Sequence, residues 1–265
     1  MDICLFWMRG PLRSIDRLCV RSMLHAGHTV RLFSYGPVPD APKGVILEDA
    51  RDVLPENLLS LVDRGVWTVG QLSDFFRVML MRDGRGIWLD TDIYLLKPFI
   101  PDPAKPFLAW EDGHRLGVSA LYFPRDCPVI GEFERHLEDF LAGRALLPNW
   151  LGFRRRVLRP LWFRALGKEL TPSQAGITIY ANDGITRLAQ RHSFIDQAAP
   201  KETFYYWNGK ACLRLYDPAF GRELLDHPGV IGIHFARKSS ALVDAKPASG
   251  SFYDWAVSRL ETSAI

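Results

Sequence analysis

The sequence has few cysteines, no long apolar run and little excess charge of either sign. Its four cysteines are Cys4, Cys19, Cys127 and Cys212. Because they form no Cys-x-x-Cys pair, their spacing favours neither a zinc site nor a disulfide framework, and we expect a reducing, cytoplasmic location. No stretch approaches the roughly 20 apolar residues that cross a bilayer. The apolar run within the first ten residues is too short for a signal sequence and is preceded by no basic leader. A formal net charge of +3 argues against a dedicated nucleic-acid binder.

The first third of the chain instead alternates short apolar runs with amphipathic stretches. Apolar runs predict strands at residues 3–7, 29–33 and 45–47, and the pattern at residues 12–26 predicts a helix that ends before Gly27. This order is typical of units in which helices pack on a parallel sheet. A chain of 265 residues is long enough for one such α/β domain, and we expect that domain to span residues 1–265.

The rest of the chain continues this pattern. A helix is predicted where apolar residues recur at helical spacing, at Leu72, Phe75, Phe76, Met79 and Leu80. Further strands are predicted at residues 86–90, 107–110, 118–123, 203–207 and 230–235, and further helices at residues 129–141, 183–192 and 252–260.

Two carboxylates follow the predicted strand at residues 86–90. Asp90 and Asp92 are two residues apart, so in an extended chain both side chains point to the same face. Ligands of open α/β sheets bind at the carboxyl ends of the strands, where this pair would lie. A divalent cation would offset the repulsion between the two charges, and oxygen ligands suit Mg²⁺ or Mn²⁺. The spacing alone fits a polar turn equally well.

The surrounding residues extend this pattern. Ser73, Asp74 and Arg77 lie on the predicted helix, and they are followed by Gly84, Gly86, Trp88, Asp90, Asp92 and Pro98. This arrangement resembles the DXD sugar-binding region of glycosyltransferase family 32, which is related to the catalytic domains of the large clostridial glucosylating toxins. Two positions depart from the family pattern, because Trp88 replaces the usual Tyr and Arg85 separates the two glycines. The strong match covers about residues 70 to 100.

The resemblance implies a GT-A fold, which is a mixed and mostly parallel sheet flanked by helices. It also implies a nucleotide-sugar donor, Mn²⁺ or Mg²⁺, and retention at the anomeric carbon. Asp92 would bind the metal, and Asp90 would contact the ribose, the sugar or the metal. Asp74 would accept hydrogen bonds from sugar hydroxyls and Arg77 would position the donor, which makes Asp74, Arg77 and Asp90 the candidate catalytic residues. Taken alone, Asp74 and Arg77 could equally form a solvated ion pair on one helix face.

The same resemblance implies that His234 completes the metal ligands and that Trp7 stacks on the nucleotide base. Arg237 and Lys238 closely follow His234 and could bind the diphosphate as charged hydrogen-bond donors. Each has a plainer interpretation. His234 could be an ordinary histidine at a strand end, Arg237 and Lys238 could form an exposed basic turn, and Trp7 could be an aromatic residue of the core. Glu111 and Asp112 could face the acceptor or lie in a solvated turn.

Residues 149–168 are basic and aromatic. The segment contains no acidic residue, and its basic residues are Arg154, Arg155, Arg156, Arg159, Arg164 and Lys168. Its apolar residues fall near helical spacing, which predicts an amphipathic helix at an anionic membrane, kinked at Pro160. The alternative is a helix packed on the domain with an arginine-rich solvent face.

These observations together predict a metal-dependent, retaining hexosyltransferase of polysaccharide biosynthesis. The donor would be a UDP-hexose, and the acceptor a hydroxyl of a surface glycan, a lipopolysaccharide or a lipid-linked oligosaccharide. Residues 1–125 would bind the nucleotide-sugar and residues 126–265 the acceptor, on the periphery of the inner face of a membrane. The alternatives are an Asp-x-Asp phosphohydrolase and a non-catalytic sugar-binding module.

Overall fold

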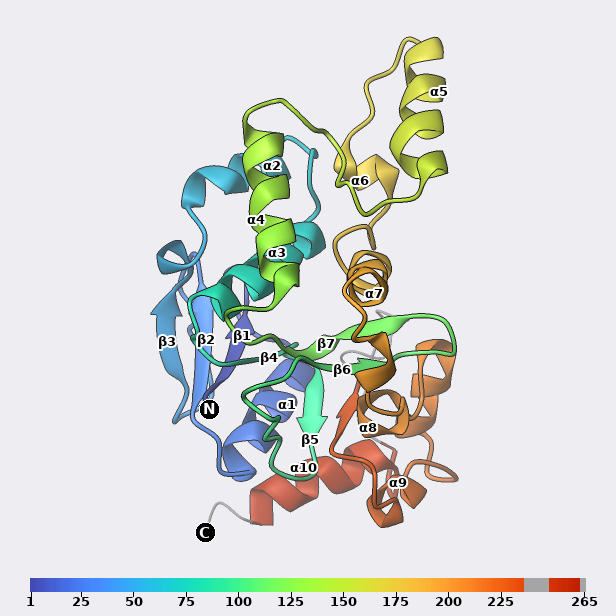
Figure 1. Cartoon of the computed structure of the whole chain (residues 1–265). Helices are drawn as coiled ribbons and strands as arrows, with labels where there is room; N and C mark the ends of the chain where they lie inside the picture. Colours follow the sequence, from blue (N-terminus) through green and yellow to red (C-terminus); the bar gives the residue numbers. More distant parts are fainter. Residues whose placement is uncertain (236–247, 263–265) are drawn as a thin grey trace.

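The computed structural model describes residues 1–235 and 248–262. Its main sheet contains β1 (Ile3–Phe6), β2 (Val30–Ser34), β3 (Ile46–Asp49), β4 (Ile87–Leu89), β6 (Phe107–Trp110) and β7 (Leu116–Tyr122). The strands lie in the order β3-β2-β1-β4-β7-β6 (Figure 1). The first four pair in parallel, whereas β7 is antiparallel to both β4 and β6. A second, two-stranded antiparallel sheet pairs β5 (Ile93–Leu95) with β8 (Gly232–His234).

Helices and shorter helical turns surround the sheets. The α-helices are α1 (Ser14–His25), α2 (Leu59–Asp63), α3 (Val69–Arg82), α4 (Pro128–Leu141), α5 (Arg159–Ala165), α6 (Pro172–Ala175), α7 (Asn182–Arg191), α8 (Glu202–Tyr205), α9 (Glu223–Asp226) and α10 (Phe252–Thr262). The 3₁₀ turns are η1 (Ala50–Asp52), η2 (Glu56–Leu58), η4 (Ile195–Gln197) and η5 (Gly209–Tyr216), and η3 (Arg154–Leu158) is a π-helical turn. No helix within the described residues is long and apolar enough to cross a membrane.

The side chains of β1 show how the two faces of the sheet are covered. Cys4 and Phe6 belong to one apolar cluster with residues of α3 and α4, whereas Ile3 and Leu5 belong to another with residues of α1. Because successive side chains of a strand point to opposite faces, helices must lie on both sides of the sheet. Figure 1 shows α3 and α4 on one side, and α1 with α10 on the other. The predicted fold class, a mixed and mostly parallel sheet flanked by helices, is confirmed.

Helix α3 carries several residues of the candidate site, and its sequence defines both of its ends. Thr68 and Gln71 form a capping box, in which each side chain accepts a hydrogen bond from the backbone N–H of the other. The helix ends at Arg82, and Gly84 adopts a φ of +64°, a conformation that favours glycine. The predicted helix over this stripe is therefore present, and it starts four residues before Ser73.

The order of the strands creates a crevice between β1 and β4. The chain leaves β1 toward β2 and β3 on one side, and later returns to place β4 on the other side of β1. The carboxyl ends of these two parallel strands therefore lie at a point where the strand order reverses. Open α/β sheets bind their ligands at such points.

Two predicted elements differ from the structure. The strand predicted at residues 203–207 is wrong, because residues 202–205 form the helical turn α8, whose Phe204 and Tyr205 are both buried. A short apolar run without periodicity does not distinguish a buried strand from a buried helix. In the predicted helix at 149–168, the helical part begins only at residue 154, and Pro160 lies in the first turn of α5, where proline is tolerated.

Candidate functional site

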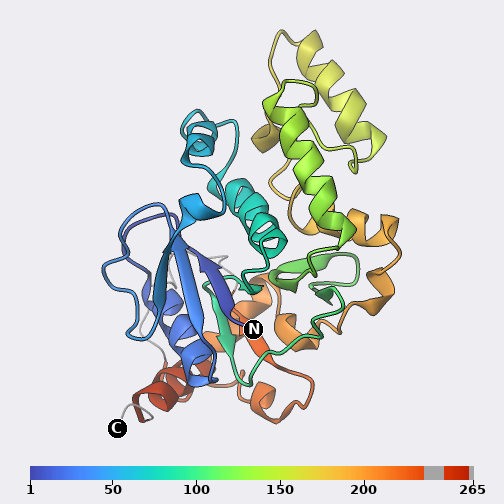
Figure 2. The same cartoon turned by 60° about the vertical axis from the view of Figure 1, so that its left-hand side comes forward.

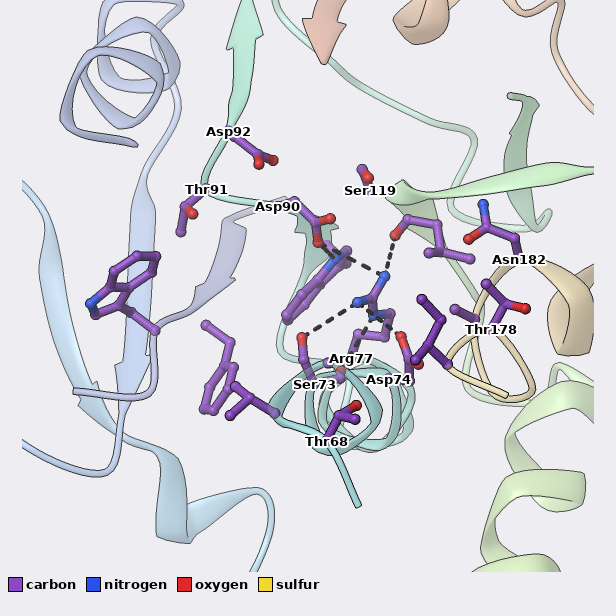
Figure 3. A pocket seen from close by; sticks show the side chains of 18 of the residues that line it. Thr68, Ser73, Asp74, Arg77, Asp90, Thr91, Asp92, Ser119, Thr178 and Asn182 are labelled. Carbon is purple, nitrogen blue, oxygen red and sulfur yellow. Dashed lines mark hydrogen bonds and ion pairs between the residues drawn. The ribbon is translucent and has the colours of Figure 1, made fainter. Parts of the chain in front are cut away.

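A cavity of about 770 Å³ opens at the reversal point between β1 and β4. Its volume falls within the range of about 300–1,000 Å³ that is usual for small-molecule sites. The cavity is lined by Trp7 after β1, by residues after β4, by α3, and by the segment that leads into α7 (Figure 3). It brings together six of the sequence-predicted site residues, which are Trp7, Asp74, Arg77, Asp90, Asp92 and His234.

The two aspartates after β4 both line this cavity, whereas the residue between them bonds elsewhere. The Thr91 hydroxyl donates a hydrogen bond to Asp16, 2.7 Å away, on the side of α1. The backbone N–H of Asp90 bonds to the carbonyl of Ser119 on β7 at 2.7 Å, which holds the turn against the sheet. The extended alternation expected from the Asp-x-Asp spacing is not present, because residues 91–92 form a turn in which the N–H of Ile93 bonds to the Asp90 carbonyl at 3.1 Å. This turn brings both aspartates to the cavity, which Thr91 also lines (Figure 3).

His234 reaches the aspartates from the far end of the chain. It lies on β8, whose pairing with β5 places it opposite Ile93, and the N–H of Phe235 bonds to the Asp92 carbonyl at 2.9 Å. Its Nε2 atom is 3.4 Å from Asp92 Oδ1 and 3.3 Å from Ser119 Oγ. Burial is the largest influence and acts to lower the pKa of His234, but the charges of Asp92, Asp90 and Glu111 together with the hydrogen bond to Asp92 make the net shift upward.

Asp90, Asp92 and His234 could together hold a metal ion. Each offers one ligand atom, and these atoms lie within 4.8 Å of one another. Two carboxylate oxygens and one imidazole nitrogen form a mixed set that accommodates Mn²⁺ or Mg²⁺, and the grouping of two negative charges favours a cation. The residues present therefore fit a divalent metal.

Arg77 lies buried beside the aspartates and is held by several protein groups. It donates to the carbonyl of Val118 at 2.6 Å and lies 3.1 Å from Asp74 Oδ1 and 3.8 Å from Asp90 Oδ1. Its guanidinium also lies over the Trp88 ring, 4.9 Å from the ring centroid. The indole N–H of Trp88 in turn donates to Asp90 Oδ1 at 2.8 Å. Arg77 and Trp88 therefore hold the Asp90 carboxylate from two directions.

Asp74 is the most deeply buried carboxylate of the cavity. It is only 3 % exposed, and burial raises its pKa to about 7, although the charge of Arg77 acts in the opposite direction. The solvated ion pair considered from the sequence is thus not present, because both members of the Asp74–Arg77 pair are buried. A carboxylate poised in this way can either accept or donate a hydrogen bond near neutral pH.

Several polar residues of the cavity were not singled out as site residues by the sequence, among them Ser119, Asn182 and Thr178. Ser119 contacts His234, Asn182 donates to Glu111 Oε2 at 2.7 Å, and Thr178 also lines the wall. A serine in the otherwise apolar strand Leu116–Tyr122 is the one signal that could have indicated Ser119. Glu111 lines the cavity, whereas Asp112 accepts hydrogen bonds from His114 and Arg115 in an exposed turn.

Two of the predicted site residues, Arg237 and Lys238, lie outside the described residues. Trp7 is half-buried, and its indole N–H donates to the carbonyl of Gly10 at 3.2 Å. It packs against the core and also lines the cavity, so its position accommodates both interpretations made from the sequence.

Comparison with known proteins found no matching protein-family model and no matching curated protein. Among solved structures, the chain is similar to one described as "PaToxG Glycosyltransferase". The TM-score is 0.43 and the sequence identity is 12%, and the match covers 74% of this chain and 87% of that chain. A reaction cannot be assigned from a similarity this low, so it has to come from the chemistry of the site residues.

Proposed function

We propose that this protein is a metal-dependent glycosyltransferase that moves a hexose from a nucleoside diphosphate sugar to a hydroxyl acceptor. The observation that carries the proposal is the cluster of Asp90, Asp92 and His234, whose ligand atoms lie within 4.8 Å of one another inside a cavity of about 770 Å³. Its place at the carboxyl ends of β1 and β4, where the strand order reverses, supports a nucleotide ligand.

These three side chains would hold Mn²⁺ or Mg²⁺. When bound, such a cation acts as a Lewis acid on the oxygens of the leaving diphosphate, which is worth several kcal/mol of transition-state stabilisation. The buried pair of Asp74 and Arg77 would act beside it. Arg77 is occupied by Val118, Asp74 and Asp90, so we assign it the positioning of the two carboxylates and the stabilisation of negative charge.

The donor would lie between Trp7 and the aspartates. Trp7 would stack on the base, which we propose to be uracil, and such stacking is worth about 1–3 kcal/mol. Asp74 would bind sugar hydroxyls, Asp90 would contact the ribose or the sugar, and Arg237 with Lys238 would add charge at the diphosphate. Retention at the anomeric carbon follows from the family resemblance of the Asp-x-Asp region.

The acceptor would be a hydroxyl of a surface glycan, a lipopolysaccharide or a lipid-linked oligosaccharide. We propose that residues 1–125 bind the donor and residues 126–265 the acceptor, because Asn182 and Thr178 form the wall opposite the aspartates (Figure 3). A cytoplasmic location is supported by the four cysteines, which are buried and form no disulfide with one another.

The test compares Asp92→Asn with Asp112→Asn, whose side chain lies in the exposed turn. UDP- and GDP-hexoses are screened with Mn²⁺ by thermal shift, and nucleotide release is then measured with the sugar that raises the melting temperature most. Asp92→Asn should lower turnover by about 1,000-fold, because it removes a metal ligand worth several kcal/mol. Asp112→Asn should retain it.

Three outcomes would contradict the proposal. Turnover that is unchanged in EDTA removes the metal from the reaction. Hydrolysis of a simple phosphate ester without nucleotide indicates a phosphohydrolase, and glycan binding without nucleotide or metal indicates a sugar-binding module.

A further inference from the structure

Helix α5 and the π-helical turn η3 before it project away from the body of the molecule. Figures 1 and 2 show this helical segment at one extremity, beyond the ends of α4 and α6 and far from the sheet. None of the twelve residues of Arg154–Leu158 and Arg159–Ala165 is buried. A helix that contributes so little to a core is unusual, because most helical stability in proteins comes from the packing of an apolar face.

The outer side of this helix is apolar. Leu158, Leu161, Trp162, Ala165 and Leu166 recur at i, i+3, i+4, i+7 and i+8, so they form one stripe, and all five are exposed. Trp162 is 60 % exposed and Leu161 is 56 % exposed. Phe153, at 66 % exposure, extends the apolar surface at the start of the segment. We call the five residues of the stripe the docking face.

Basic residues flank the docking face. At 100° per residue, Arg159 and Arg164 fall on either side of the apolar stripe, and both are exposed. Residues 149–168 contain no acidic residue that could offset this charge. Arginine on such flanks can keep its charged head near water while its stem covers apolar surface. An apolar face bordered by cations is the pattern of helices that lie in the surface of a bilayer.

The inner side of the segment is fixed to the body, so the orientation of the docking face is set by the fold. Arg155 forms an ion pair with Asp183 of α7, and Phe163 packs against the main core. Just before the segment, Trp150 is buried and donates its indole N–H to the carbonyl of Ile179 at 3.0 Å. These contacts hold one side of the helix, and the apolar side stays outward.

We propose that the docking face binds the surface of a bilayer that contains anionic lipids. Apolar side chains would enter the boundary between headgroups and acyl chains, while the flanking arginines would contact lipid phosphates. Charge complementarity favours this partner over a second copy of the chain, because two docking faces brought together would oppose arginine to arginine. Binding requires neither nucleotide nor metal, so the proposal goes beyond the glycosyltransferase activity and stands or falls independently of it.

The experiment measures co-sedimentation of the full chain with vesicles of phosphatidylcholine alone, or of phosphatidylcholine mixed with phosphatidylglycerol. The native protein should sediment with the mixed vesicles and stay in solution with pure phosphatidylcholine. Leu161→Ser/Trp162→Ser should abolish the binding. Arg159→Glu/Arg164→Glu should lower the partition coefficient by roughly 25-fold or more, since each basic residue contributes about fivefold.

The controls separate the docking face from general surface properties. Ile100→Ser removes an apolar side chain that is 76 % exposed elsewhere, and Lys43→Glu/Lys105→Glu reverses two exposed charges away from the segment; both should bind like the native protein. Trp162→Phe should still bind while losing part of the blue shift in tryptophan emission that the vesicles induce. Far-ultraviolet circular dichroism establishes that each variant is folded.

The proposal is overturned if the native protein stays in solution with the mixed vesicles. It is also overturned if the Lys43 and Lys105 reversals reduce binding as much as the Arg159 and Arg164 reversals, because net charge alone would then explain the result. A dimer in lipid-free sedimentation velocity that Leu161→Ser/Trp162→Ser disperses would assign the face to a second copy of the chain instead.

Discussion

The cavity and the docking face depart from ordinary burial in opposite directions. In the cavity, Asp74 and Arg77 are almost completely buried although both can carry charge. On the docking face, Leu161 and Trp162 are exposed although both are apolar. Charged residues are usually exposed, and large apolar residues are usually buried unless they serve an interaction. Both regions are therefore better explained by what they bind than by what they add to stability.

The two regions differ in whether other residues of the protein compensate for the unusual burial or exposure. The buried charges of the cavity have partners within the protein, because Arg77 contacts Asp74, Asp90 and the carbonyl of Val118. The docking face has no such compensation within the described residues, since no side chain of α5 is buried. Substitutions in the cavity should therefore change stability strongly, and substitutions on the docking face should hardly change it.

The largest expected effect on stability is that of Arg77→Met. Removal of the guanidinium leaves Asp74 buried beside no cation, which should lower the free energy of unfolding by about 3–5 kcal/mol. Arg51→Met is the matched control, because Arg51 pairs with Asp49 and Glu56 on the surface, where solvent screens the ion pair, so the variant should lose far less stability. Urea denaturation of both variants measures this difference. Equal losses of unfolding free energy would contradict the expected difference between a buried and an exposed ion pair.

The pH dependence of stability should show the burial of Asp74. Its pKa is raised to about 7 in the folded protein, so between about pH 4 and pH 7 the folded state binds more protons than the unfolded state. The contribution of Asp74 to the free energy of unfolding should therefore fall by about 2–4 kcal/mol as the pH rises through this window, and then level off.

Asp74→Asn isolates this contribution from those of other titrating groups. The native protein should lose stability relative to the variant as the pH is raised from 4.5 to 7.5 in urea denaturation. Parallel curves for the two proteins over this range would show that Asp74 has the same pKa in both states.

The smallest expected effect is that of Trp162→Ala. Because this side chain is exposed, its removal should change the free energy of unfolding by less than about 0.5 kcal/mol. Trp150→Ala should cost about 3–5 kcal/mol, since Trp150 is buried and hydrogen-bonded to Ile179. A large loss for Trp162→Ala in the absence of lipid would mean that the docking face is part of the core.

Much of the fold could be predicted from the sequence, because the spacing of apolar residues indicates which side of a helix or strand is buried. The stripe on α3 and the apolar runs of β1, β2 and β4 each have one dominant interpretation, and their order indicates a parallel sheet. The apolar run at residues 203–207 does not have one dominant interpretation. Its adjacent apolar residues fit a buried strand as well as the helical turn in which Phe204 and Tyr205 are buried.

Spacing alone indicated only the local part of the candidate site, whereas Trp7 and His234 were expected from the family resemblance and also line the cavity. Asp90, Asp92, Asp74 and Arg77 lie within one stretch of the chain, so their spacing could be compared with a known pattern. Ser119 and Asn182 reach the cavity through tertiary packing, and no spacing rule connects them to Asp92. The burial of the Asp74–Arg77 pair was missed for the same reason, because what covers a helix face is decided by distant segments.

The backbone pairing between β5 and β8 has a consequence for biosynthesis. Asp92 and His234 are separated by 142 positions, yet His234 on β8 pairs with Ile93, the residue that follows Asp92. A nascent polypeptide therefore exposes both aspartates long before the histidine leaves the ribosome, on the order of ten seconds earlier at ordinary rates of translation. Until then the two carboxylates lack their third partner, so the proposed three-residue cation site would form only after β5 and β8 have paired.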